Sequence, residues 1–173
     1  SLTFSRRCTM IESNREIKKP SEKREIMPRF EASALRGYCV SVLTASGVER
    51  SCAEAVADAL IDAELTGVST HGVSRLAVYM QRMDAGVMSR ENNIRIVRES
   101  TSTLVVDAGN SLGAAAAKFA MERCIAKAKE TGCCFASVHS SNHFGTAAYY
   151  TRLAAAQDMI CLLYTSDAAD DLL

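Results

Sequence analysis

The spacing of the apolar residues changes from a helical to a β period near residue 90, and this change constrains the fold more than any other feature. Before it, apolar residues recur at three- and four-residue intervals; after it, "NIRIVRES" alternates and "STLVVDAG" is a β-branched run. An Ala-rich helical segment, the apolar run "CCFASV" and another helical segment follow. This order predicts an α/β fold, in which an N-terminal helical region precedes strand–helix units of a mixed sheet.

The helical region, residues 27–90, is predicted to begin with an antiparallel helix pair. The segment "FEASALRGYCVSVLTASG" places Cys39 and Leu43 on one apolar stripe and ends with a glycine that can stop a helix. The segment "SCAEAVADALIDAELTG" opens with Ser51 and Glu54 at the spacing of a capping box, which predicts the start of a second helix. Each helix has one apolar face, so we expect the two faces to pack on each other.

The remaining elements are predicted from their stop signals. The segment "THGVSRLAVYMQRMDAG" predicts a third helix, with Thr70 as its N-cap and Gly86 as its stop. The α/β part, residues 91–160, is predicted to open with a hairpin about Ser100 and to contain "CCFASV" as a short buried strand.

Both ends of the chain differ from the rest. Residues 1–26 contain seven Lys/Arg, four Asp/Glu and no apolar period, so we expect a disordered arm. They could instead be translated upstream DNA, because codons for "KREIM" can contain a ribosome-binding site just before Met27. The segment "CLLYTSDAADD" can be encoded by a transposase-based sequencing adapter, so residues 161–173 are expected to be a non-native tail. Its start, "CLLY", could still pair as a makeshift strand.

Charge and composition exclude several classes of function. The formal net charge is zero, which argues against a nucleic acid or a membrane surface as a partner. No apolar run approaches the roughly 18 residues of a membrane span, and the polar N-terminus lacks a secretory core, so a cytoplasmic protein is expected. The seven cysteines form no C-x-x-C pair and are interpreted as small buried thiols. No cluster of carboxylates and histidines indicates a metal site.

His71 is the first candidate for proton transfer, a role that suits histidine near neutral pH. Arg75 lies four residues later on the same face of the predicted helix, where it could bind a substrate carboxylate through two parallel hydrogen bonds. Beside it, a partly buried imidazole can remain a neutral base. In the alternative, Thr70 caps the helix, His71 bonds locally and Arg75 forms a surface ion pair; spacing alone favours this structural interpretation.

His143 is the second candidate, because "SNHFG" joins a predicted strand to a predicted helix. Ligands of open α/β sheets bind beyond the carboxyl ends of strands, and Asn142 offers a donor and an acceptor beside the imidazole. Equally, Asn142 could cap the helix while His143 fills a gap. His139 falls within the strand and is interpreted as structural. Gly109 and Gly113 are interpreted as a turn residue and a helix-start residue, because neither a dinucleotide fingerprint nor a P-loop is present.

Three spaced segments together carry a family resemblance. "DAELTGVSTHGVSRLAVYMQRMDAGVM", "VDAGNSLGAAAAKFAMERCIAKAKETG" and "SVHSSNHFGTAAYY", in this order, resemble the type 2 malate/L-lactate dehydrogenase family, over about Phe30 to Ile160. That family also contains ureidoglycolate, sulfolactate and diketogulonate enzymes. Its members are about twice this length and use NAD or NADP on a non-Rossmann fold. The resemblance therefore implies a truncated chain that lacks the main cofactor-binding segments.

The resemblance also implies roles for individual residues. The family's S-H-G-x-x-R motif falls on Thr70 to Arg75, which implies a catalytic His71 and a substrate-binding Arg75. Thr70 replaces the usual serine and keeps its hydroxyl. The S-N-H-F-G motif falls on Ser141 to Gly145, which implies a second active-site histidine, His143, with Asn142 beside it. Thr70, Arg75 and Asn142 would then contact the substrate.

The implied activity is reversible hydride transfer between nicotinamide and C2 of a 2-hydroxy acid such as malate or lactate, with a histidine moving the hydroxyl proton. Either histidine could be that group. The resemblance further implies a homodimer when the protein is full length, and no activity of this chain alone. The alternative from another class is a non-catalytic, helix-rich interaction domain, in which the histidines serve as caps and core. The two histidines should lie together with Arg75 in an enzyme and could lie on opposite faces otherwise.

Overall fold

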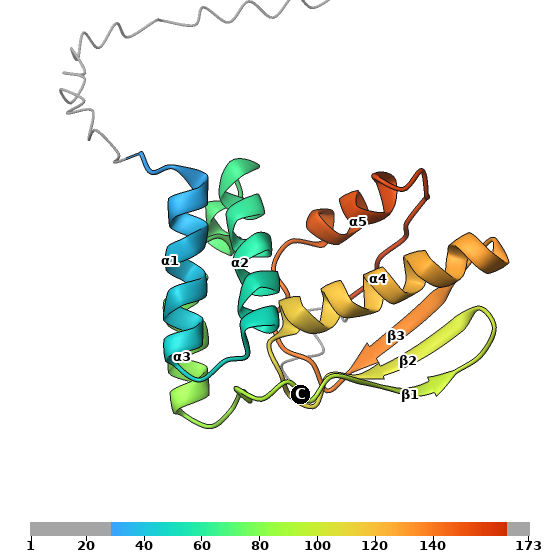
Figure 1. The fold of residues 1–173 in the computed structure, drawn as a ribbon, viewed down its shortest axis with the longest axis horizontal. Helices are drawn as coiled ribbons and strands as arrows, with labels where there is room; N and C mark the ends of the chain where they lie inside the picture. Colours follow the sequence, from blue (N-terminus) through green and yellow to red (C-terminus); the bar gives the residue numbers. More distant parts are fainter. Residues whose placement is uncertain (1–28, 166–173) are drawn as a thin grey trace, which may run out of the picture.

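The computed structural model describes residues 29–165, so the expectations for residues 1–26 and for most of the tail lie outside the described part (Figure 1). Its elements, in chain order, are helices α1 (Ala32–Ala45) and α2 (Arg50–Leu65), the short 3₁₀ helix η1 (Ser69–His71), α3 (Arg75–Asp84), strands β1 (Arg95–Glu99) and β2 (Thr103–Asp107), α4 (Gly113–Thr131), β3 (Phe135–His139) and α5 (Ala147–Ala155).

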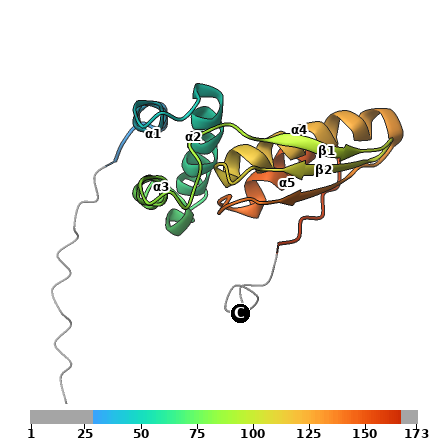
Figure 2. The same ribbon diagram turned by 90° about the horizontal axis from the view of Figure 1, so that it is seen from below.

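The helices α1 and α2 form the predicted antiparallel pair, with α3 beside them (Figure 1). The core between them is apolar and almost fully buried, and it includes Cys39 and Leu43 of α1 and Val56 and Leu60 of α2. The helix α2 also packs against α4 and α5, so it joins the helical group to the α/β part. Figure 2 shows this group at one end of the molecule, with α4 lying along the sheet.

Two predicted helix starts are wrong. In α2, Ser51 lies inside the helix and its hydroxyl donates to Glu49 at 2.5 Å, while Glu54 pairs with Arg50, so no capping box forms. Thr70 caps no helix either. It belongs to η1, and Gly72 then takes a ψ of −149°, which interrupts the helical path until α3 begins.

The sheet has the order β1-β2-β3 and is mixed, as predicted. The strands β1 and β2 form the antiparallel hairpin about Ser100, while β2 and β3 run parallel with Val105 opposite Ser137. The helix α4 covers one face, on which Leu104 and Val106 are buried. The prediction that "CCFASV" is a buried strand is wrong: β3 is an edge strand among residues 29–165, and Phe135 is 69% exposed.

Two smaller predictions also need correction. Among the six cysteines of residues 29–165, only Cys39 and Cys52 are buried, whereas Cys133 is exposed, because it precedes the edge strand rather than lying on a packed helix face. The segment "CLLY" forms no strand; Leu162 and Tyr164 are 79% and 86% exposed, so no neighbouring strand covers them.

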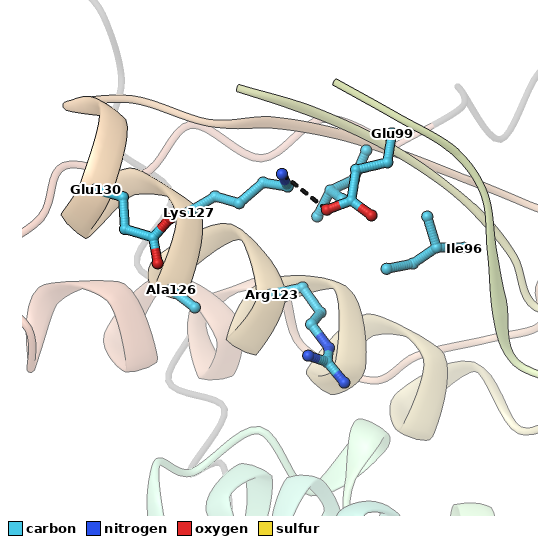
Figure 3. A pocket seen from close by; sticks show the side chains of 7 residues that line it. Ile96, Glu99, Arg123, Ala126, Lys127 and Glu130 are labelled. Atoms are coloured by element: carbon cyan, nitrogen blue, oxygen red, sulfur yellow. Dashed lines mark ion pairs between the residues drawn. The ribbon is translucent and has the colours of Figure 1, made fainter. Parts of the chain in front are cut away.

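A hollow of 240 Å³ lies between the hairpin and α4 (Figure 3). Its lining is both apolar and charged, and Lys127 of α4 pairs across it with Glu99 of β1 at 2.7 Å. It lies near the start of β2, whereas "SNHFG" follows the end of the parallel strand β3. The hollow is therefore separate from the predicted functional residues.

Candidate functional site

The structure brings His71 and His143 together. His71 ends η1 in the connection between α2 and α3, and His143 lies in the connection between β3 and α5. Their rings are stacked, with centroids 5.3 Å apart and planes inclined by 28°. Two histidines from the helical region and the α/β part thus form one site at the junction of the two.

The hydrogen bonds around His71 are made by residues close to it in the chain. The Thr70 hydroxyl lies 3.0 Å from Nδ1 of His71, and Nε of Arg75 donates to the Thr70 carbonyl at 2.7 Å. The alternative in which Arg75 forms a surface ion pair finds no support, because no carboxylate between residues 29 and 165 pairs with it. Since its Nε is engaged with the backbone, the outer nitrogens of Arg75 can bind an anion.

Glu64, near the end of α2, holds the segment that carries His71. Its Oε1 accepts the backbone N–H of Val73 at 2.8 Å. The Gly72 backbone lies so close that a Cβ there would be 2.0 Å from Oε1 of Glu64. Glycine leaves room for this approach without displacing the carboxylate, whose bond to the Val73 N–H fixes the turn between His71 and Arg75.

Tyr79 of α3 is the polar partner of His143. Its hydroxyl lies 2.8 Å from Nδ1 of His143, and its side chain is almost fully buried at 2% exposure. Burial raises the pKa of Tyr79 to about 12, so the hydroxyl stays protonated at neutral pH. Burial is also the main cause that lowers the pKa of His143, followed by the electrostatic influence of Arg75, His71 and Arg82. His143 is therefore neutral at neutral pH.

This contact links the two ring nitrogens of His143. When Nδ1 carries the proton, it donates to the Tyr79 oxygen and leaves Nε2 as a base. When Nε2 has taken up a proton, the imidazolium keeps its Nδ1–H bond to the Tyr79 oxygen and can give the Nε2 proton back. The same contact therefore supports both the base form and the acid form of His143.

Asn142 anchors the segment that carries His143. Its Nδ2 donates to the Asn110 carbonyl and side-chain oxygen at 3.0 and 2.9 Å, and to the Ser111 carbonyl at 3.0 Å. Its Oδ1 lies 3.5 Å from an outer nitrogen of Arg82. At Gly113 a Cβ would be 2.0 Å from the Asn142 carbonyl, so glycine lets the start of α4 pack against this backbone.

The alternative in which Asn142 caps the following helix is wrong. The helix α5 begins at Ala147, and its N-cap, Thr146, makes no side-chain cap bond. The side chain of Asn142 is instead directed to the preceding loop, as described above. The buried Tyr150 of α5 donates to the Phe144 carbonyl and thereby fixes the other end of the segment.

His139 lies apart from this pair. It ends β3, is exposed, and has Nδ1 3.0 Å from the Ser140 hydroxyl and 3.8 Å from Oδ1 of Asp107. None of these contacts leads to His71 or His143.

Sequence analysis missed three residues of the site: Glu64, Tyr79 and Arg82. The last two had a usable signal, because Arg75, Tyr79 and Arg82 follow one another at intervals of four and three residues on one face of α3. Glu64 had none, because its partner is the N–H of a distant backbone group.

Two features of the described residues bear on the class of site. No group of three or more histidine, cysteine, aspartate or glutamate side chains within residues 29–165 is placed to hold a metal ion. In the same part of the chain, no helix is both long and apolar enough to cross a membrane.

Several known proteins are similar to this chain in sequence, and solved structures are similar to it in fold. The L-sulfolactate dehydrogenase of Methanothermobacter thermautotrophicus is 40% identical over 135 residues, which are 78% of this chain and 38% of that protein. The malate/(S)-sulfolactate dehydrogenase of Methanothermus fervidus is 35% identical over 131 residues, 76% of this chain and 39% of that protein. The solved malate dehydrogenase of Pyrococcus horikoshii matches with a TM-score of 0.73 and 37% identity, covering 75% of this chain and 37% of that one.

The chain thus spans less than two fifths of the length of these relatives. The sequence model of one family, Malate/L-lactate dehydrogenase, matches residues 30–170, which extends past Ile160, where the resemblance was expected to end. Since this match covers most of the chain, the chain belongs to the malate/L-lactate dehydrogenase family.

Proposed function

We propose that this chain is part of an NAD(P)-dependent oxidoreductase that interconverts a 2-hydroxy acid, such as malate or lactate, and its 2-oxo acid. The observation that carries the proposal is the stacked pair of His71 and His143, next to a substrate-binding candidate, Arg75, in a chain of this family. Proton transfer and carboxylate binding are the two tasks that such a reaction asks of protein side chains.

We assign proton transfer to His143. In oxidation, its bare Nε2 takes the proton of the substrate hydroxyl while hydride leaves C2, and Nδ1–H donates to Tyr79. In reduction, the proton returns from Nε2 to the oxygen of the 2-oxo acid. His71 lies against the His143 ring and hydrogen-bonds the same substrate oxygen, with its ring oriented by the Thr70 hydroxyl.

Arg75 binds the C1 carboxylate of the substrate. Its guanidinium offers two parallel donors to a carboxylate, which also fixes the orientation of C2 relative to His143. Asn142 holds the His143 segment from one side, and its side-chain oxygen faces Arg82 and the site.

Nicotinamide, when bound, supplies the hydride acceptor. The glycines of the described residues do not fit a dinucleotide-binding loop: Gly109 has a φ of +55° in a turn, and Gly113 is filled by the Asn142 backbone. We therefore place the main cofactor-binding residues in family segments outside this chain and propose that the chain alone is inactive. The choice between NAD and NADP follows from those segments. A homodimer completes the proposal and rests on the family resemblance.

The test is an assay of the full-length gene product against 2-hydroxy acids, malate, lactate, sulfolactate and ureidoglycolate, with NAD and with NADP. The proposal expects the absorbance of reduced nicotinamide to rise with at least one acid. Turnover of none of them, by a folded protein that retains the His71–His143 contact, would favour a non-catalytic interaction domain instead.

A further inference from the structure

Arg82 is a charged residue of the site that the reaction described above does not use. It lies on the same face of α3 as Arg75 and Tyr79, and an outer nitrogen of Arg82 is 3.5 Å from Oδ1 of Asn142, the residue before His143. The side chain therefore extends from α3 toward the segment that holds the proposed proton-transfer group.

The site contains more positive charge than one carboxylate can neutralise. None of the ion pairs formed between residues 29 and 165 includes Arg75 or Arg82. Both guanidinium groups lie near enough to His143 to lower its pKa, and the imidazole itself is neutral at neutral pH. A substrate with a single carboxylate leaves one of the two arginines without a counter-charge.

We propose that Arg82 binds a second anionic group of the substrate, so that the site prefers 2-hydroxy acids with a carboxylate or sulfonate at the far end over monocarboxylates. The proposal rests on the proposed function, because it assumes that Arg75 binds the C1 carboxylate. The two arginines are seven residues apart, roughly 10 Å along the helix. Arg82 reaches the His143 segment through Asn142, and Arg75 is held beside His71 by its bond to the Thr70 carbonyl. Such an arrangement holds a short dianion across the ring of His143.

A structural role for Arg82 makes a different prediction. Arg82 is the basic residue in the last turn of α3, where a cation is favoured by the helix dipole, and it contacts Asn142. If these contacts were its whole role, its replacement would lower stability and affect all substrates alike. Discrimination between a dianion and a monoanion therefore separates the two roles.

The experiment compares malate and lactate as substrates of the full-length gene product and of its Arg82→Gln and Arg82→Lys variants. For Arg82→Gln we expect the KM for malate to rise roughly 10- to 100-fold, the effect of losing a hydrogen bond between charged groups, with kcat nearly constant. The KM for lactate should change less than about 3-fold, since lactate has no second anion. Arg82→Lys should restore part of the malate affinity. The control is Arg98→Gln on β1, an exposed arginine far along the chain from α3.

Three outcomes would overturn the proposal. Equal effects of Arg82→Gln on malate and lactate would mean a structural role. A rise in the KM for NAD or NADP, with substrate KM unchanged, would mean that Arg82 binds a cofactor phosphate. A wild-type protein that oxidises neither acid would remove the proposed function and this inference together, whereas an active wild type with an unaltered malate-to-lactate ratio in Arg82→Gln would remove only the inference.

Discussion

The hydroxyl of Tyr79 lies 2.8 Å from Nδ1 of His143, so a buried tyrosine of α3 is the hydrogen-bond partner that orients this imidazole. Replacing Tyr79 by Phe removes the hydroxyl and keeps the ring. Because one oriented hydrogen bond is lost, we expect kcat to fall about 10-fold, with little change in KM. Steady-state kinetics of the full-length variant check this. An unchanged kcat would show that the contact does not assist proton transfer.

Arg75→Lys should act mainly on substrate binding. A lysine keeps the charge but offers one point of contact in place of a two-pronged donor, so we expect KM to rise about 10-fold and kcat to change less. Arg50→Lys is the matched control, since Arg50 is exposed and pairs with Glu54 within α2. If KM stays at the wild-type value, Arg75 does not touch the substrate.

Gly72→Ala tests how Glu64 fixes the His71 segment. The added Cβ would meet the Glu64 carboxylate at 2.0 Å, so this side chain must move away from the Val73 N–H. We expect a loss of about 1–3 kcal/mol in the free energy of unfolding, the cost of leaving that donor unsatisfied. Gly37→Ala is the opposite control. Gly37 lies within α1 with no atom near its Cβ position, and alanine there should stabilise by roughly 0.5–1 kcal/mol. Chemical denaturation of both variants measures the two values, and a Gly72→Ala protein as stable as wild type would mean that the bond between Glu64 and the Val73 N–H does not hold the turn.

The lowered pKa of His143 predicts a loss of stability in acid. In the unfolded chain the imidazole takes up a proton near its ordinary pKa of 6.5; in the folded protein, burial and the charges of Arg75, His71 and Arg82 oppose this. Below 6.5 the unfolded state therefore binds more protons, and the free energy of unfolding falls until the folded pKa is passed. Above 6.5 the effect is absent.

Unfolding of the wild type and of His143→Gln at about pH 7.5 and pH 5 measures this contribution. The wild type should lose more stability than the variant, because all other titrating groups are common to both. Equal losses in the two proteins would mean that His143 titrates alike in the folded and unfolded states.

The spacing of the apolar residues and the glycines that can stop a helix predicted most of the fold. The helices about Cys39, the hairpin about Ser100 and the long helix after Gly113 lie where local sequence placed them, because each is determined by residues close in the chain. Ser51 and Thr70 have side chains suited to cap a helix, but neither caps one. At Thr70 the reason is the backbone conformation of Gly72, which separates this residue from the start of α3.

The geometry of the site could not be predicted from spacing alone. His71 and His143 were separate candidates, and nothing local required that their rings stack. Tyr79 was not a candidate, because its contact with His143 joins residues far apart in the chain. Asn142 was predicted to contact the substrate. Its hydrogen bonds to Asn110 show that it also connects the loop after β3 to the loop between β2 and α4. Each of these contacts joins residues distant in sequence, so only the tertiary structure reveals it.

The central claim is that His71 and His143 act together on a 2-hydroxy acid. The most direct measurement is the kcat of the full-length gene product on its best 2-hydroxy acid, compared with His71→Ala, His143→Ala and the control His139→Ala. We expect His143→Ala to lower kcat by about 100-fold or more, the usual effect of losing a general acid–base group. We expect His71→Ala to lower kcat by a similar factor, because the hydrogen bond to the reacting oxygen is lost, whereas His139→Ala retains wild-type turnover. Wild-type turnover in both the His71 and the His143 variant would contradict the claim.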